Sequence, residues 1–161
     1  MKIINAGVTA PKGFKCAGLR AGVKSGKTNK DMAMIVSEVP AKIAGTFTKN
    51  IVKAAPVLWG KKIVEEQEAV RAVVINTGIA NACTGAQGYE NVVTEAKEVA
   101  KLLDIKPEEV VVGSTGVIGQ QLPMDVIKEG IKKLVPELKA DRQSEEDASW
   151  AILSLIHISE P

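Results

Sequence analysis

EVVVGSTGVIG, at residues 109–119, is the stretch that decides the fold of this chain. Its consecutive valines favour a buried strand over a helix, because β-branched side chains are stiff and pack well on a pleated surface. From Gly113 to Gly119 the residues carry no charge, and a helical pattern follows from Pro123. The sequence therefore predicts a strand that ends in a small-residue loop before a helix. In α/β proteins, ligands usually bind at this carboxyl end of the sheet.

The predicted loop is suited to binding an oxygen that carries negative charge. Glycines allow the backbone to approach a bound group, and adjacent backbone N–H groups can converge on one oxygen. We predict that Thr115 and Gly116 form this oxyanion-binding loop. Two alternatives stay open on physical grounds: the loop is only a tight structural connection, or it belongs to a phosphate- or nucleotide-binding module without catalysis.

The composition indicates a globular domain and argues against several classes of function. The chain has 161 residues, 45% hydrophobic and 25% charged, so it can bury a core. Its net charge is +2, and its lysines are spread along the chain, so the basic patch of a nucleic-acid-binding protein is not evident. Cys16 and Cys83 belong to no CxxC pattern and are expected to be reduced, buried residues. We expect a cytoplasmic protein without a metal site or a membrane span.

One pattern, a strand followed by a small-residue loop and a helix, occurs twice. Residues 70–75 are the first apolar strand, followed by an uncharged loop at 76–88 and a helix that ends near Leu103. The stretch 109–134 repeats the pattern. The remaining elements precede these units: strand candidates at 14–23, 32–37 and 45–48, and a short polar helix at 61–68. The sequence therefore predicts a layered, mixed-sheet α/β domain.

Other polar stretches carry no catalytic set. Ser25-Gly26-Lys27-Thr28 resembles the end of a phosphate-binding P-loop, but Ala21 stands where that motif needs its first glycine. We interpret the tetrad as a hairpin tip, and the acidic run at 145–147 as a solvated helix start. The only histidine, His157, lies near the end of the chain, so no Ser-His-Asp or Cys-His set can form in residues 1–156. The chain thus offers an oxyanion-binding loop without a nucleophile.

Four segments of the chain resemble the N-terminal part of a known family, the bifunctional glutamate N-acetyltransferase/ornithine acetyltransferases of arginine biosynthesis. They are GVTAPKGF at 7–14, AAPV at 54–57, NTGIANACTG at 76–85 and STGVIG at 114–119. They occur in the order that the family has, and the likeness runs from about residue 7 to about residue 153.

The resemblance implies a layered α/β fold related to that of N-terminal nucleophile hydrolases. It implies a precursor that cleaves itself before a threonine, which becomes the nucleophile of the second chain and whose free amine can serve as base. The acetyl group passes from N2-acetylornithine to this threonine and then to glutamate; some members also use acetyl-CoA, and no cofactor is implied. The family's oxyanion hole maps onto Thr115 and Gly116. Its assembly is usually a heterotetramer, with two alpha and two beta chains.

The likeness ends where the family has a Thr-Thr-Asp-Thr segment, whose threonine helps hold the substrate. Residues 154–161 read SLIHISEP instead, which looks like a translated sequencing adapter. We expect residues 1–153 to be the N-terminal, alpha-chain-like part of such an enzyme and 154–161 to be a non-native tail. Ser154 stands at the first threonine position and is the candidate substrate-binding residue. Without the beta chain and its nucleophile, the fragment is expected to be inactive, and a non-functional fragment is a further alternative.

Overall fold

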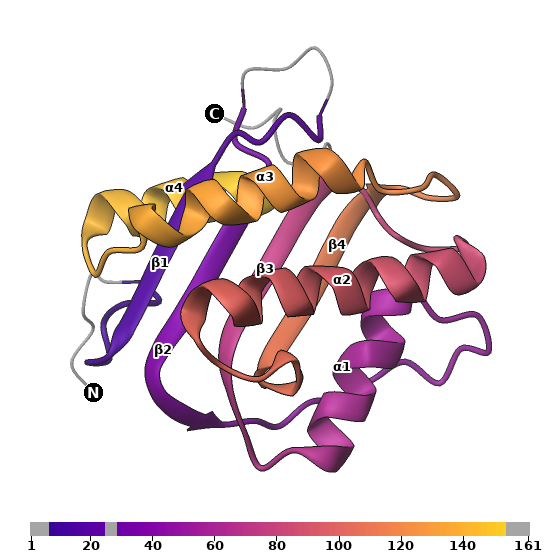
Figure 1. Cartoon of the computed structure of the whole chain (residues 1–161), viewed down its shortest axis with the longest axis horizontal. Coiled ribbons are helices and arrows are strands. Elements are labelled where there is room, and N and C mark those ends of the chain that lie inside the picture. Colours follow the sequence, from indigo (N-terminus) through magenta and orange to yellow (C-terminus); the bar gives the residue numbers. More distant parts are fainter. Residues whose placement is uncertain (1–6, 25–28, 154–161) are drawn as a thin grey trace.

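A four-stranded sheet in the order β1-β2-β3-β4 forms the centre of the structure (Figure 1). The structure is a computed structural model and describes residues 7–24 and 29–153. The main elements are β1 (Phe14–Leu19), β2 (Met32–Lys42), α1 (Ala55–Glu66), β3 (Ala69–Ile79), α2 (Gly85–Leu103), β4 (Val110–Val117), α3 (Met124–Leu134) and α4 (Arg142–Ile152). Two short 3-10 turns, η1 (Pro107–Glu109) and η2 (Val135–Glu137), precede β4 and follow α3.

The sheet is mixed. β1 pairs with β2 and β2 pairs with β3 in antiparallel fashion, whereas β3 and β4 are parallel. Parallel neighbours need a crossover, and α2 provides it between β3 and β4. The predicted layered, mixed-sheet α/β domain is therefore confirmed.

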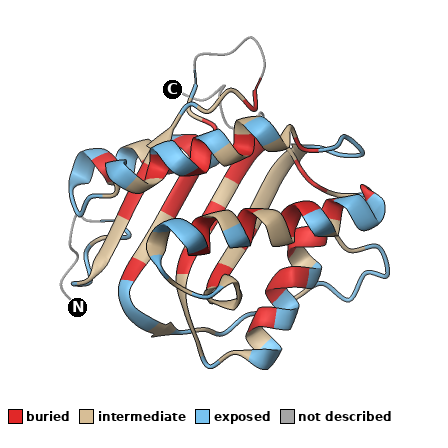
Figure 2. Cartoon of the chain, in the orientation of Figure 1, coloured by how far each residue is buried: buried red, intermediate tan, exposed pale blue. Residues whose placement is uncertain are grey.

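Alternation along the strands separates the two faces of the sheet. One face carries Met34, Val74 and Val112, which belong to the main apolar core. The helices α1, α2 and α3 cover this face, and their buried residues belong to the same core; Figure 2 shows which parts of these helices are buried. Periodic burial of apolar side chains on both layers is the main force that holds them together.

The opposite face of the sheet is covered only in part. There α4 packs its Ala148 and Ala151 against Cys16 and Ala33, mostly over β1 and β2. On β3 and β4 the same face carries residues that stay half-buried: Val73, Ile75, Val111, Gly113 and Thr115. Two neighbouring strands therefore present a partly open, largely apolar surface.

Both parallel strands run further than the sequence predicts. The pairing continues from Ala72 with Val110 to Ile79 with Val117, so only residues 80–84 remain of the loop predicted at 76–88. The predicted loop at 113–119 is likewise strand as far as Val117. The glycines and small polar residues of both segments stay in the ladder because each strand supplies the other's backbone hydrogen bonds.

Three further boundaries were predicted wrongly. No strand forms at 45–48, where the ring of Phe47 packs against α1 at Gly60 instead of joining the sheet. β2 extends to Lys42 and includes Pro40 at an irregularity in its pairing, a position that tolerates proline. The helix expected at 61–68 is α1, which begins much earlier because Pro56 suits the first helical turn.

Candidate functional site

Thr115 and Gly116 lie inside β4, in register with Thr77 and Gly78 of β3. Because side chains alternate along a strand, those of Thr77 and Thr115 share the partly open face of the sheet. Thr115 is half-buried, and its hydroxyl makes no hydrogen bond to any residue that the structure describes. The predicted site residues are therefore adjacent and within reach of a group placed on the open face.

Gly116 brings the two backbones unusually close together. Its φ of +137° and the +112° of Gly78 are values that residues with a side chain rarely adopt. A Cβ at position 116 would overlap the Gly78 carbonyl group and lie 2.7 Å from the nitrogen of Ile79. Glycine is required at position 116 because the neighbouring strand leaves no room for a side chain.

The connections after β3 and β4 are bonded to each other, which fixes the end of the sheet. Ala80 N donates to Val117 O at 2.9 Å, and Gly119 N donates to Ala82 O at 2.9 Å. The Gln121 side chain adds a bond to Thr84 O at 2.9 Å. The segment after the site residues is therefore held in one place by the 80–84 connection.

Amide and hydroxyl groups of the 80–84 connection bond mainly to one another. Asn81 Nδ2 donates to Gly88 O at 3.0 Å, and the Thr84 hydroxyl donates to Asn81 Oδ1 at 2.7 Å. Asn81 is fully buried and has a positive φ of 39°, so these bonds hold the backbone in an uncommon conformation. The bonds of Asn81 and Thr84 therefore shape the end of the sheet.

The two cysteines have different surroundings. Cys16 is buried, as predicted, and burial, with smaller effects of nearby carboxylates, raises its pKa to about 11. Such a thiol stays protonated and unreactive at neutral pH. Cys83 was predicted to be buried, and this is wrong: it is exposed in the turn before α2, with a φ of 56°. The turn conformation, which the sequence does not reveal, directs its side chain outward.

Sequence reasoning missed the polar contacts that hold the carbonyl end of α4. The Thr77 hydroxyl donates to Ala151 O at 2.9 Å, and the Lys24 ammonium donates to Leu153 O at 3.0 Å. Asp31, fully buried, accepts backbone N–H bonds from Ala21, Gly22 and Lys24. The one signal in the sequence that could have predicted their burial is that these polar residues stand next to apolar strand residues.

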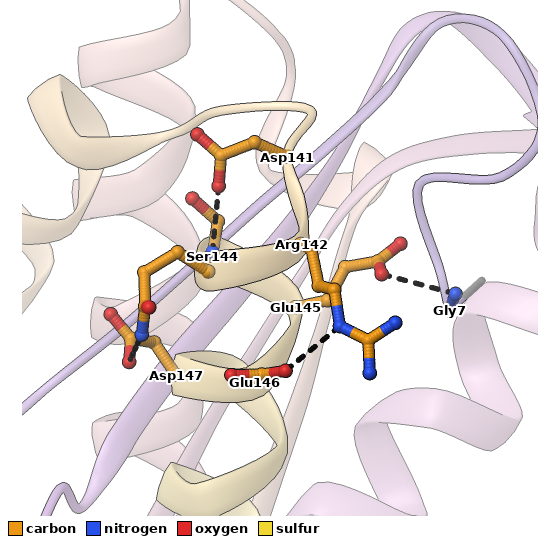
Figure 3. Close-up of polar contacts among 8 residues, drawn as sticks. Gly7, Asp141, Arg142, Ser144, Glu145, Glu146 and Asp147 are labelled. Carbon is orange, nitrogen blue, oxygen red and sulfur yellow. Dashed lines mark hydrogen bonds and ion pairs between the residues drawn. The ribbon is translucent and has the colours of Figure 1, made fainter. Parts of the chain in front are cut away.

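The N-terminal half of α4 holds the start of the described chain (Figure 3). Asp141 caps the helix by accepting from Ser144 N at 2.8 Å. Glu145 accepts from Gly7 N at 3.1 Å, Thr9 N at 2.9 Å and the Thr9 hydroxyl at 2.5 Å. These bonds, those from Thr9 above all, lower the pKa of Glu145. The acidic run at 145–147 is thus not merely solvated, because one of its carboxylates binds a distant segment.

A hollow of about 720 Å³ lies beside β1, at the opposite side of the sheet from Thr115 and Gly116. Its lining mixes charges of both signs, including Arg20, Lys133, Asp141 and Asp147. Within the described ranges, no group of three or more His, Cys, Asp or Glu residues could hold a metal ion. Neither Thr115 nor Gly116 lines this hollow, so it is not part of the predicted oxyanion site.

Three sequence-based interpretations lie outside the described residues. They concern the tetrad Ser25-Gly26-Lys27-Thr28, the candidate substrate-binding residue Ser154 and His157. Ser154 and the expected tail at 154–161 remain predictions. Among the helices that the structure describes, none has the length and apolar character needed to cross a membrane.

The family model and the curated relatives that match this chain all carry the name ArgJ. The model of the ArgJ family matches residues 15–154. The arginine biosynthesis bifunctional protein ArgJ of Streptococcus mutans is 47% identical over 154 residues, 96% of this chain and 37% of its own length. Its chloroplastic namesake from Citrullus lanatus is 44% identical over 151 residues, 94% of this chain and 33% of its own length. The chain thus spans about a third of the length of these curated relatives.

Solved structures share the fold. The arginine biosynthesis bifunctional protein argJ from Bacillus halodurans superposes with a TM-score of 0.90 at 39% identity, over 96% of this chain and 79% of that chain. Ornithine acetyltransferase from Mycobacterium tuberculosis, solved in complex with ornithine, gives a TM-score of 0.88 at 40% identity, over 93% of this chain and 80% of that chain.

Proposed function

The chain belongs to the ArgJ family, and from that premise we propose that it is the N-terminal part of an acetyltransferase of arginine biosynthesis. The enzyme moves an acetyl group from N2-acetylornithine to glutamate through an acyl-threonine. The nucleophilic threonine lies in a second chain, beyond residue 153. The longer polypeptide that contains both parts is the parent enzyme.

The observation that carries the proposal is the pairing of Thr115 and Gly116 against Thr77 and Gly78. It places the Thr115 hydroxyl, which has no partner among the described residues, on the open face of the sheet, next to a glycine whose backbone is held closely against β3. A tetrahedral intermediate there would be stabilised by the Thr115 hydroxyl or backbone and by the Gly116 N–H. Each such donor is worth about 3–4 kcal/mol in comparable sites.

Self-cleavage into two chains, which we propose for the parent enzyme, would account for the different coverages of the relatives. This chain covers 79% of the Bacillus halodurans chain in its crystal structure but only 37% of the curated Streptococcus mutans polypeptide. The solved chains are thus much shorter than the curated polypeptides, as cleavage of a precursor would produce. The new N-terminal threonine would supply both nucleophile and, through its amine, the base.

The partly open face of β3 and β4 is where we place the second chain. Half-buried Val73 and Ile75 lie on the same face of the sheet as Thr115, so a chain that covers this face along its length would meet the oxyanion donors. Burial of this apolar surface would stabilise the association. We propose two copies of each chain in the assembly, no resident cofactor, and acetyl-CoA as a second acetyl donor. We also propose a cytoplasmic location, which a fluorescent fusion of the parent enzyme would test.

The test is acetyl transfer by the parent enzyme after substitution of Thr115. Thr115→Val removes the hydroxyl while keeping the side-chain shape, and Thr94→Val, on the exposed side of α2, is the matched control. We expect Thr115→Val to lower kcat by about a hundredfold, as loss of an oxyanion donor does, and Thr94→Val to leave it unchanged. If Thr115→Val transfers acetyl groups as fast as the wild type, the Thr115 hydroxyl does not stabilise the oxyanion.

A further inference from the structure

The carbonyl end of α4 lies beside the candidate oxyanion donors. The Thr77 hydroxyl donates to Ala151 O at 2.9 Å, and Thr77 is in register with Thr115 on the same face of the sheet. Neighbouring strands are about 4.8 Å apart. The last turn of α4 therefore sits one strand away from Thr115.

Lys24 holds the same helix end from a second direction. Its ammonium donates to Leu153 O at 3.0 Å, and only 5% of the residue is exposed. A cation at the carboxyl end of a helix is favoured by the helix dipole, and a buried charge-assisted bond is among the stronger hydrogen bonds. The stem of Lys24 packs on Gly78, where a Cβ would lie 2.9 Å from Lys24 Cγ.

The backbone around Lys24 is itself fixed. Asp31 is fully buried and accepts from Lys24 N at 3.0 Å and from Ala21 N at 2.6 Å. The carbonyl of Asp31 accepts from Thr77 N at 2.8 Å. Asp31 thus connects the segment that contains Lys24 to Thr77 of β3, so both residues that contact the end of α4 are held by the same buried residue.

We propose that Thr77 and Lys24 are positioning residues that fix the carbonyl end of α4 as a wall of the oxyanion site beside Thr115. The inference rests on the proposed function, because the oxyanion site acts in the parent enzyme. Neither residue has to touch substrate. Each acts through the backbone of α4, and misplacement of a wall of the site by about 1 Å can cost a hundredfold in rate.

The first experiment measures kcat per acylatable site in the parent enzyme. The acetyl-enzyme formed from N2-acetylornithine counts the sites, so a loss of folded enzyme does not imitate a positioning effect. We expect Thr77→Val and Lys24→Met to lower kcat per site by about ten- to a hundredfold, and Thr77→Ser, which restores the hydroxyl, to recover most of it. Thr94→Val and Lys61→Met alter half-buried Thr94 and exposed Lys61, residues of the same types on α2 and α1, and should retain full activity. Unchanged kcat per site in Thr77→Val and Lys24→Met would overturn the proposal.

A second experiment separates this inference from the proposed function. Hydrogen exchange of the full chain is followed at the amides of residues 149–153, with α3 as the internal reference. We expect Thr77→Val and Lys24→Met to accelerate exchange at 149–153 by at least about tenfold, since the helix end loses a tether, and to leave α3 unchanged. Equal exchange in variant and wild type would refute the tether even if acetyl transfer is confirmed. If the parent enzyme transfers no acetyl group, the proposed function is refuted, and the exchange rates at 149–153 still decide whether Thr77 and Lys24 hold the end of α4.

Discussion

Gly116 is the residue with the least tolerance for change in the candidate site. Its positive φ and the Gly78 backbone against it both exclude a side chain. We predict that Gly116→Ala lowers the free energy of unfolding by more than about 3 kcal/mol, because strain and overlap with backbone atoms add. Urea unfolding followed by circular dichroism measures this.

Gly85 provides the matched control for Gly116. It also has a positive φ, +66°, but a Cβ there would meet nothing within 4 Å. Gly85→Ala should therefore cost only the strain of the conformation, about 1 kcal/mol. If the two variants lose equal stability, the close approach of β4 to β3 is not what requires glycine at position 116.

Glu95 is predicted to make the stability of the fold depend on pH. It is fully buried on α2, neither of its oxygens has a partner among the described residues, and burial raises its pKa to about 8. Because the folded protein then holds this proton more tightly than the unfolded chain, stability is greatest below the ordinary glutamate pKa. It falls as pH rises toward the raised pKa of about 8.

Glu95→Gln removes that titration. We expect the variant to exceed the wild type in stability at pH 8 by a margin on the order of 1–3 kcal/mol, and to show a much smaller difference at pH 5. Thermal unfolding at the two pH values measures the margin. A difference that does not change between pH 5 and pH 8 would mean that Glu95 is already ionised in the folded protein.

Individual residues show what sequence could and could not predict. Thr115 and Gly116 could be chosen as candidates from sequence because they follow a buried strand at the carboxyl end of the sheet, where α/β proteins usually bind ligands; their role stays a prediction. The burial of Glu95 was not predicted, because the apolar residues of α2 already form a complete buried face without it. A sequence does not show which polar residue lies on that face. Thr77 was missed because its partner on α4 is distant in sequence.

At the scale of elements, sequence predicted the order better than the boundaries. The two strand–helix units were found because apolar β-branched runs and helical periodicity are local signals. The ends of β3 and β4 were not, because glycine, serine and threonine usually mark loops, whereas here the pairing of two parallel strands keeps them extended. The absent strand at 45–48 has the same cause: a strand needs a neighbour, and a sequence does not supply one.

The contact between α4 and the start of the chain is predicted to depend on Glu145. Its carboxylate binds Gly7 and Thr9, and these bonds lower its pKa. The contact should therefore be complete above the ordinary glutamate pKa and be lost as pH falls through the lowered value. We expect Glu145→Gln to accelerate amide exchange at residues 7–9 at neutral pH, measured by mass spectrometry.

Glu146 offers the control for that prediction. It lies next to Glu145 on α4, but among the described residues it pairs only with Arg142, on the exposed side of the helix, at 3.0 Å. Glu146→Gln should leave exchange at 7–9 unchanged, because exposed pairs within one helix contribute little. Equal acceleration in both variants would indicate a general loosening of α4 rather than the loss of one tether.

At the scale of the whole molecule, the open half of the sheet predicts how the isolated chain behaves. Val117, Ile118 and Trp150 are 44%, 64% and 61% exposed, and Val73 and Ile75 on the open face of β3 are only half-buried. Apolar surface of this kind marks an interface or an aggregation-prone patch. We expect the isolated chain to self-associate in light scattering, and Ile118→Ser with Trp150→Ser to reduce that association. A monodisperse monomer at high concentration would argue against an interface on this face.

The most direct test of the central claim is to trap the acetyl-enzyme of the parent protein. The parent enzyme is incubated with N2-acetylornithine in the absence of glutamate, digested and examined by mass spectrometry. We predict one added acetyl group on the N-terminal threonine of the second chain, released when glutamate is supplied, and strongly reduced in Thr115→Val. An acetyl group that never accumulates on that threonine, or that accumulates equally in Thr115→Val, would contradict the account.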